Sequence, residues 1–243
     1  MNGAKLRSRL RAGEVITMLN THHVSSGLVQ RLIEHGADSV FLDCEHGMWS
    51  HEDIRSHAQA ARSVGGAGIV RPQSHDRSGM IRYLNAGADG LMVPMVDTAE
   101  QCAAVVDAVR YALPGSYEDR LVICMIETPE AIANLDEMLK VEGVDVFFVG
   151  PSDLSQNMGY SPALPATEMR PPEVVEAIEH VFGKVRGAGR ATGTLVREAD
   201  IGHWTEKGGQ FLYIHSDPFL KAGLARMNSL IRQGQPSAMA ASF

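Results

Sequence analysis

Four apolar, β-branched runs in this sequence lead into charged residues of types that carry out chemistry in enzymes. These residues are Asp43, Arg71, Glu127 and Asp153, and His46 follows the first of them closely. Carboxylates are preferred ligands of hard cations, a guanidinium stabilises a developing anionic oxygen, and an imidazole exchanges protons near neutral pH. Together these residue types suit the stabilisation of an enolate beside a divalent ion, provided that the fold brings them together.

The elements that must position these residues alternate regularly along the chain. Eight short apolar runs are each followed by a helix-like stretch, which predicts βαβ units and a parallel sheet. That number of units predicts a closed (β/α)8 TIM barrel, in which the carboxyl ends of all strands converge on the face that carries the active site. The predicted strands cover residues 14–20, 40–46, 69–72, 90–96, 123–127, 146–153, 191–196 and 211–215.

The chain length predicts one barrel domain over residues 1–243. Residues 1–12 are predicted to hold a short N-terminal helix, and the small polar residues 235–243 to form a frayed tail. An apolar stripe on the last helix is predicted to pack as ordinary core rather than as an interface. It comprises Phe219, Leu220, Leu224, Met227, Leu230 and Ile231.

Composition excludes several classes of function. The formal net charge is -7 with no basic block, which disfavours nucleic acid and anionic membrane surfaces as partners. No apolar secretory core opens the sequence, and no run reaches membrane-spanning length. The cysteines, Cys44, Cys102 and Cys124, form no C-x-x-C pair, so neither a disulfide framework nor a zinc site is indicated. These features predict a reduced, cytoplasmic protein.

Glu127 and Asp153 are the candidate metal ligands. They end strands that neighbour each other in barrel order, and two close carboxylates repel unless a proton or a cation joins them. Oxygen ligands select Mg²⁺ or Mn²⁺, and two carboxylates leave coordination positions for water and for a chelating 2-oxo acid. The alternative is that either carboxylate caps a helix or pairs with Arg71.

Arg71 and His46 are the candidate groups for charge stabilisation and proton transfer. Arg71 precedes Pro72, which keeps its backbone extended, and its guanidinium suits an enolate oxygen or a carboxylate. The alternative role for Arg71 is a salt bridge to Glu45 or Asp43. His46 suits general acid–base work, with Asp43 or Glu45 fixing its tautomer, and its alternative is a histidine exposed in a loop.

The segment from Gly150 to Ser155 is a candidate anion site. If a short helix begins there, the amides of Ser152 and Asp153 point at the site and suit a carboxylate. His22 and His23 also follow a strand end and are candidates for its mouth. A Schiff-base mechanism needs a lysine at the carboxyl end of a strand. The lysines are Lys5, Lys140, Lys184, Lys207 and Lys221, and none of them has such a position.

In these motifs the sequence resembles the metal-dependent (class II) pyruvate aldolases, the family of 4-hydroxy-2-oxoheptanedioate aldolase and 2-dehydro-3-deoxyglucarate aldolase. The resemblance covers nearly the whole chain, in order and with similar spacing. The matching stretches are residues 42–47, 70–72, 91–95, 126–128, 150–155 and 158–160.

The resemblance implies a TIM barrel of the phosphoenolpyruvate/pyruvate type that assembles as a hexamer of paired trimers with the last helix exchanged. It implies a divalent metal, Mg²⁺ or Mn²⁺ with Co²⁺ or Zn²⁺ also compatible. Site roles follow from it as well. Glu127 and Asp153 bind the metal, and His46, oriented by Asp43, is the base. Arg71 stabilises the enolate, and the amides of Ser152 and Asp153 bind the pyruvate carboxylate. Glu45 supports the site.

The implied activity is the reversible cleavage of a 4-hydroxy-2-oxo acid to pyruvate and an aldehyde through a pyruvate enolate that the metal stabilises. Alternatives are an oxaloacetate-type decarboxylase with the same enolate chemistry, and a non-catalytic barrel that binds 2-oxo acids. Two departures stand out. Met125 replaces a glutamine common in the family, and the connection from Tyr111 to Leu121 is shorter, which is expected to alter the choice of aldehyde.

Overall fold

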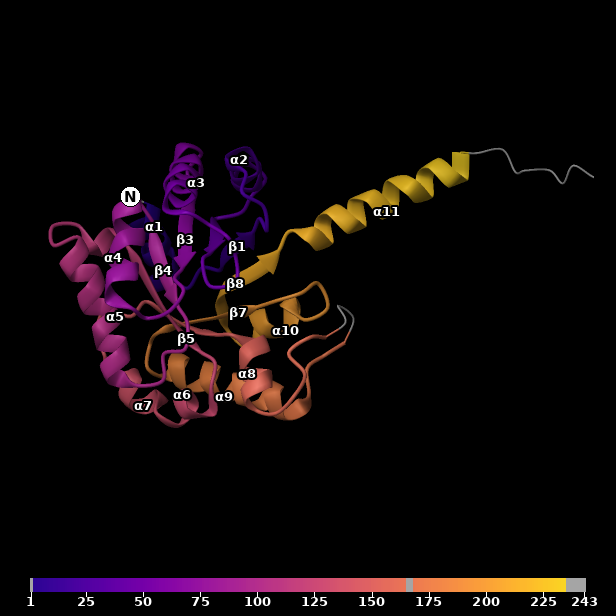
Figure 1. Cartoon of the computed structure of the whole chain (residues 1–243). Coiled ribbons are helices and arrows are strands. Elements are labelled where there is room, and N and C mark those ends of the chain that lie inside the picture. Colours follow the sequence, from indigo (N-terminus) through magenta and orange to yellow (C-terminus); the bar gives the residue numbers. More distant parts are fainter. Residues whose placement is uncertain (1, 165–167, 235–243) are drawn as a thin grey trace, which may run out of the picture.

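The predicted TIM barrel is confirmed. A computed structural model of the chain describes residues 2–164 and 168–234, in which the strands form one closed barrel of parallel neighbours (Figure 1). The order around the barrel follows the sequence, so the first and last strands also pair. The strands are β1 (Ile16–Asn20), β2 (Ser39–Asp43), β3 (Ala67–Arg71), β4 (Gly90–Val93), β5 (Leu121–Ile126), β6 (Val146–Val149), β7 (Ala191–Leu195) and β8 (Gly209–His215).

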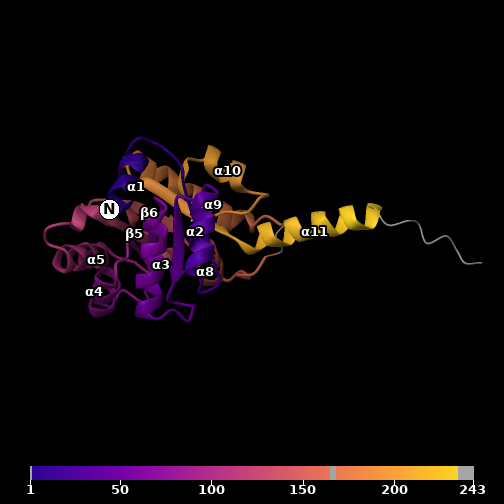
Figure 2. The ribbon, with the colours of Figure 1, turned by 90° about the horizontal axis from the view of Figure 1, so that it is seen from above.

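Helices follow the strands and form the outer layer of the barrel (Figure 2). Side chains of Ser25, Ser50, Asp76, Thr98 and Thr128 cap the amino ends of five of these helices, as the sequence favours. The helices are α1 (Asn2–Arg11), α2 (Ser26–Glu34), α3 (His51–Ser63), α4 (Arg77–Ala86), α5 (Ala99–Ala112), the 3₁₀ helix η1 (Tyr117–Asp119), α6 (Pro129–Ala133), α7 (Leu135–Met138), α8 (Pro151–Asn157), α9 (Pro172–Gly187), α10 (Ile201–Glu206) and α11 (Asp217–Gly234).

β2, β4 and β6 end at least three residues earlier than the sequence pattern predicts, and the endings of β2 and β6 shape the site. β2 stops at Asp43, where the carboxylate accepts the backbone amides of Glu45 and His46 and turns the chain. β6 stops at Val149, because Pro151 opens α8 instead of continuing the strand. The side chains that follow these strands therefore sit on turns and on a helix at the carboxyl end of the barrel.

The core has two layers, one inside the barrel and one between the barrel and its helices. Phe41, Ile123 and Phe148 are among the buried side chains that fill the barrel. Leu6 and Leu10 of α1 join this inner cluster and close the amino end of the barrel. Strands buried on both faces explain why their sequences are nearly continuous in apolar residues. A filled barrel leaves room for a site only at the carboxyl end.

The packing predicted for the last helix is wrong. Figure 1 and Figure 2 show α11 projecting away from the barrel in both views. Its apolar stripe, from Phe219 to Ile231, has side chains that are 53–65% exposed. Helical spacing identified an apolar face correctly, but the same spacing fits core and interface alike. The predicted frayed tail, residues 235–243, lies outside the described residues.

The short connection between α5 and β5 lies at the amino end of the barrel. Within it, η1 packs on α1, and Arg7 donates to the backbone carbonyls of Glu118 and Arg120. It enters β5 at Leu121, opposite the end that carries the site. None of the described residues of this connection lines the site cavity of its own chain. This connection therefore does not contact the site cavity of its own chain, and its effect on the choice of aldehyde stays a prediction.

Candidate active site

A cavity of about 430 Å³ opens at the carboxyl ends of the strands. Its walls gather residues from distant parts of the sequence, including most of those singled out for chemistry. Glu45 contacts the guanidinium of Arg71 and does not itself line the cavity. Met125 of β5 also lines the cavity, as does Glu127, which directly follows this strand, in agreement with strand alternation. The lining residues predicted to carry chemistry are Asp43, His46, Arg71, Glu127, Ser152 and Asp153.

Arg71 is held rigidly by two acids. Its Nε and Nη2 donate to the two oxygens of Asp43 at 2.9 and 2.7 Å, and Nη1 lies 3.0 Å from Glu45 Oε2. Burial acts to raise the pKa of Asp43, but the hydrogen bonds and charge of Arg71 outweigh it and hold that pKa below its ordinary value. The carboxylate therefore stays ionised, and the bidentate pair fixes the guanidinium in one orientation.

His46 lies at the rim of the cavity. Its side chain is 66% exposed, and its Nε2 lies 3.8 Å from Glu45 Oε2. Asp43 accepts the backbone amide of His46 and directs its carboxylate to Arg71. The structure thus brings Glu45, rather than Asp43, to the imidazole ring. Burial raises the pKa of Glu45 from its ordinary value, and Arg71 opposes that shift.

Glu127 is the most constrained carboxylate of the site. The residue is only 1% exposed, and its Oε2 accepts the backbone amide of Met95 at 2.9 Å. Its Oε1 is buried without a hydrogen-bond partner among the described residues. A side chain at position 150 would place its Cβ 2.2 Å from Oε1, so only Gly150 leaves this oxygen its space. Met95 supplies its amide from a left-handed backbone with φ of 52°.

The carboxylates fit a divalent cation. Burial raises the pKa of Glu127 to about 8, Asp153 adds to the shift, and the Met95 amide and Arg71 oppose it. A buried acceptor without a donor and a neighbouring carboxylate need a positive partner. No group of three or more ligating side chains occurs in residues 2–164 and 168–234. Two carboxylates therefore leave most coordination positions to water and substrate, as Mg²⁺ sites commonly do.

The start of α8 presents free donors to the same cavity. The amides of Ser152 and Asp153 have no hydrogen-bond partner within the described part of the chain. Arg170 binds the hydroxyls of Ser155 and Ser152 at 2.8 and 3.2 Å and so orients this turn. Burial lowers the pKa of Arg170 to about 10, and it remains cationic near neutral pH. No sequence motif singles out Arg170, because it lies in a long irregular loop.

A polar patch that no sequence motif indicates forms the wall of the cavity at β1 and β8. It consists of Asn20, His22, Tyr213 and His215, and we call it the β1/β8 patch. Only His22 was a candidate for the mouth, on its place after a strand. His23, its neighbour, is exposed and does not line the cavity. Asn20 and His215 end β1 and β8, Tyr213 lies two residues before His215, and closing the barrel joins β8 to β1.

Comparison with known proteins decides the family. A model of the HpcH/HpaI aldolase/citrate lyase family matches residues 17–217. The chain belongs to this family. The predicted resemblance is confirmed, and so is the expected enzyme class, a carbon–carbon lyase of the aldolase type. The family generally depends on a divalent metal.

Relatives within the HpcH/HpaI aldolase/citrate lyase family include curated enzymes and solved structures. The chain is 32% identical over 218 residues, 80% of each protein, to the 2-keto-3-deoxy-L-rhamnonate aldolase of Escherichia coli strain K12. An HpcH/HpaI aldolase from Desulfitobacterium hafniense superposes with a TM-score of 0.79 at 25% identity, covering 95% of this chain and 97% of that one. The citrate synthase SbnG superposes with a TM-score of 0.81 at 26% identity, covering 93% and 97%.

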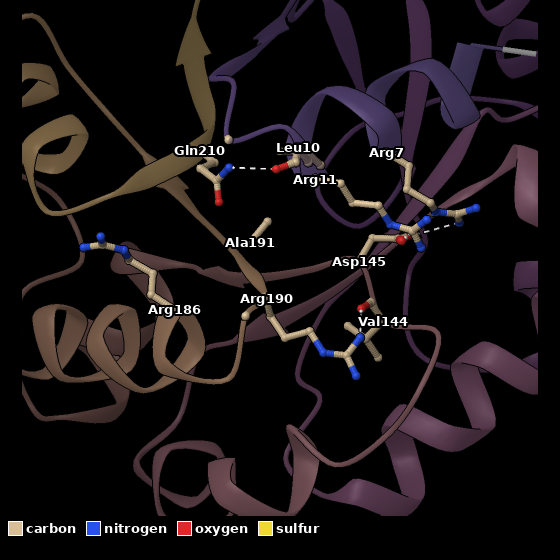
Figure 3. A pocket seen from close by; sticks show the side chains of 11 residues that line it. Arg7, Leu10, Arg11, Val144, Asp145, Arg186, Arg190, Ala191 and Gln210 are labelled. Atoms are coloured by element: carbon tan, nitrogen blue, oxygen red, sulfur yellow. Dashed lines mark hydrogen bonds and ion pairs between the residues drawn. The ribbon is translucent and has the colours of Figure 1, made fainter.

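A second cavity, of about 360 Å³, lies at the amino end of the barrel and lacks comparable chemistry. Figure 3 shows Arg7 beside Asp145, with Arg190 extending toward Val144. Arg7 binds both Asp145 oxygens at 2.6 and 2.8 Å, and Arg190 donates to the Val144 carbonyl at 3.1 Å. Gln210 donates to the carbonyl of Leu10 at 3.0 Å. These contacts attach α1 to the floor of the barrel, which is a structural role.

The β1/β8 patch makes stability depend on pH. Burial lowers the pKa of His215 from its ordinary value of 6.5, the neighbouring His22 adds to this, and Asp217 opposes it, while the phenol of Tyr213 faces the same ring. The unfolded chain then binds the proton more tightly, so this stability is full above about pH 6.5 and is lost as the pH falls through the lower folded pKa. We expect the free energy of unfolding of His215→Gln, measured by urea titration, to fall less than that of wild type between about pH 7 and 5. A free energy of unfolding that falls equally with pH in both proteins would contradict this assignment.

Proposed function

We propose that this chain is a metal-dependent aldolase that reversibly cleaves a 4-hydroxy-2-oxo acid to pyruvate and an aldehyde. The observation that carries the proposal is the buried, unpartnered oxygen of Glu127, which shares a cavity with Asp153 and the rigid Arg71. This combination provides a cation site and an anion-stabilising donor around a space of substrate size. The reaction named for the Escherichia coli relative supports it.

Glu127 and Asp153 would hold the ion, which we assign as Mg²⁺ or Mn²⁺, with Co²⁺ or Zn²⁺ as substitutes. When bound, it supplies Lewis-acid stabilisation of negative charge on the ketone oxygen of the 2-oxo acid. The free amides of Ser152 and Asp153 bind the carboxylate of that acid. Arg170 holds the hydroxyl of Ser152 and so keeps this turn in place.

Arg71 supplies the charge that stabilises the enolate oxygen. A guanidinium has five N–H donors, and the contacts of Arg71 with Asp43 and Glu45 occupy three of them. The donors that remain on Nη1 and Nη2 are available to the substrate. Since Asp43 fixes the guanidinium before substrate arrives, little reorganisation accompanies the reaction.

His46 exchanges the proton at the pyruvate methyl carbon. Its exposed imidazole can exchange protons with solvent, and the Glu45 carboxylate lies 3.8 Å from its Nε2. Enolate formation requires a base that gains this proton, and pyruvate release requires an acid that returns it. An imidazole with access to water serves both directions.

The experiment that tests the proposal compares two classes of substrate. We expect pyruvate release from 4-hydroxy-2-oxo acids in the presence of Mg²⁺ or Mn²⁺, at a higher kcat/KM than from oxaloacetate. Faster release from oxaloacetate would instead identify a decarboxylase that uses the same enolate. Absence of both activities in the metal-loaded protein would indicate a binding barrel without catalysis.

The protein acts on small molecules, pyruvate and an aldehyde, and we propose that it assembles as a hexamer through α11. An apolar face that is 53–65% exposed on one helix supports burial against another copy of the chain. Helix exchange would also bury the stripe that α11 leaves uncovered on its own barrel. The buried, unpaired thiols of Cys44, Cys102 and Cys124 support a reducing, cytoplasmic location. No helix within residues 2–164 and 168–234 is long and apolar enough to cross a membrane.

A charge placed in the apolar stripe is expected to dissociate this assembly. Leu224→Asp puts a carboxylate at an interface position, where an unpaired buried charge costs several kcal/mol, whereas Ala225→Asp puts it on the opposite face of α11. Light scattering should then give a smaller particle for Leu224→Asp and an unchanged one for Ala225→Asp. A monomeric wild-type protein, or identical masses for all three, would refute the helix-mediated assembly.

A further inference from the structure

The β1/β8 patch contains a pair of histidines that the proposed mechanism does not use. His22 Nε2 lies 2.8 Å from His215 Nδ1, and the two rings stack with centroids 4.9 Å apart. The Tyr213 hydroxyl lies 3.4 Å from the same Nδ1 and accepts from Asn20 Nδ2 at 2.7 Å. His22 has a left-handed backbone with φ of 52°, which is uncommon outside glycine and is enriched at functional sites.

The hydrogen bonds fix how this pair carries protons. Asn20 Oδ1 accepts the backbone amide of His22 at 2.8 Å, so its Nδ2 must be the donor to Tyr213. Burial raises the pKa of the phenol far enough to keep it protonated, and its oxygen lies 3.4 Å from His215 Nδ1. One proton lies between His22 Nε2 and His215 Nδ1, so that one ring donates and the other accepts. A second proton beyond the neutral form would place an N–H group on both facing nitrogens, and these groups repel each other. The pair therefore holds at most one proton more than its neutral form.

The pair lines the wall of the cavity away from the groups that are assigned to the pyruvate head. β1 and β8 lie four and three places from β5 in the closed order of strands, so His22 and His215 stand on the far side of the cavity from Glu127. The carboxylate and ketone of a 2-oxo acid are assigned to Glu127, Asp153 and the start of α8. A substrate chain that extends from these groups toward β1 and β8 would bring its C4 hydroxyl to the pair.

We propose that the His22–His215 pair is the acid–base group for the C4 hydroxyl, separate from the histidine that serves the pyruvate methyl. This inference rests on the proposed aldolase function. The patch offers neutral donors and acceptors, which suits an alcohol that becomes a carbonyl. Asn20 and Tyr213 are positioning residues, because Asn20 accepts the backbone amide of His22 and Tyr213 contacts the ring of His215.

The proton and electron balance of cleavage is complete with these groups. The C4 hydroxyl gives its proton to the pair, and its oxygen forms the carbonyl of the departing aldehyde. The electron pair of the broken C3–C4 bond passes to the pyruvate fragment, which becomes the enolate. His46 then delivers a proton to C3 to form the methyl group, and the pair returns its proton to water.

Two assays separate this role from that of His46. Exchange of pyruvate methyl protons in D₂O with Mg²⁺ requires enolate formation but no C4 hydroxyl. Cleavage of 4-hydroxy-2-oxopentanoate requires both proton transfers. The variants are His22→Gln and His215→Gln, and His23→Gln is the matched control because that neighbouring side chain does not line the cavity.

We expect His22→Gln and His215→Gln to lower kcat for cleavage by about 10²–10⁴-fold while methyl exchange stays within about threefold of wild type. His23→Gln should leave both rates unchanged. The proposal is overturned if both rates fall in parallel, which indicates a structural role, or if cleavage is unaffected. Failure of the aldolase function itself would look different, because wild type would then not cleave 4-hydroxy-2-oxopentanoate.

Discussion

Glu127→Gln is expected to abolish divalent-metal binding and to lower both cleavage and methyl exchange by on the order of 10³-fold, which corresponds to several kcal/mol of Lewis-acid stabilisation. The amide preserves the shape of the side chain and removes the charge that a cation needs. It retains an acceptor for the Met95 amide, so the fold should survive. Calorimetric titration with Mn²⁺, together with both rate assays, measures the effect.

The matched control for this change is Glu130→Gln. Glu130 is exposed in the first turn of α6, three positions along the chain, and it does not line the cavity. Its substitution should change neither the affinity for Mn²⁺ nor either rate. Wild-type affinity for Mn²⁺ in Glu127→Gln would show that the carboxylate is no ligand. An intact metal site with a lost rate would assign Glu127 to another step.

Arg71→Lys has the second largest expected effect. Lysine keeps the charge but cannot form the bidentate contact with Asp43 while also reaching Glu45 and the substrate. Loss of a preorganised donor to an oxyanion lowers kcat by about 10²–10³-fold. Because the enolate forms in both assays, methyl exchange and cleavage should fall together, while the affinity for Mn²⁺ is retained.

Arg82→Lys is the matched control, because Arg82 is exposed on the neighbouring helix α4. Its rates should equal those of wild type. In Arg71→Lys the Asp43 carboxylate keeps only part of its hydrogen bonding, which lowers stability as well. Thermal unfolding of this variant therefore shows whether a lower rate comes from the lost guanidinium or from loss of the folded state. An unchanged kcat for both reactions would remove Arg71 from the mechanism and leave it as the structural partner of the two acids.

The barrel and the acidic end of the site could be predicted because both depend on local sequence. Alternation of apolar runs with helical stretches defines the units, and a parallel barrel places every strand end on one face. The meeting of Glu127, Arg71 and Asp153 in one cavity could therefore be predicted without knowledge of tertiary contacts. Gly150 could also be noted in the sequence, but its close approach to Glu127 is visible only in the structure.

The pairing of side chains within the site depended on register, which the sequence leaves open. The residues alone leave Asp43 or Glu45 open as the partner of His46, and the family resemblance implies Asp43. In the structure, however, Asp43 lies beside Arg71 in the register of β2 and β3. The guanidinium, with two donors at 2.7 and 2.9 Å, outcompetes a single imidazole for that carboxylate. Glu45 then becomes the acid nearest to His46.

The β1/β8 patch and α11 could not be read from local patterns for a related reason. His22 and His215 are 193 positions apart and meet only when the last strand closes against the first. The stripe on α11 has the spacing of any amphipathic helix, and the spacing does not say which molecule covers it. Both features depend on what lies beyond the local sequence.

Exchange of pyruvate methyl protons in D₂O, followed by proton NMR, tests the central claim most directly. The claim is that Glu127 and Asp153 hold a divalent ion that lets this cavity form the pyruvate enolate. The account predicts rapid exchange with Mg²⁺, and loss of that exchange both after exhaustive chelation and in Glu127→Gln. Exchange that continues undiminished in chelated Glu127→Gln would contradict it.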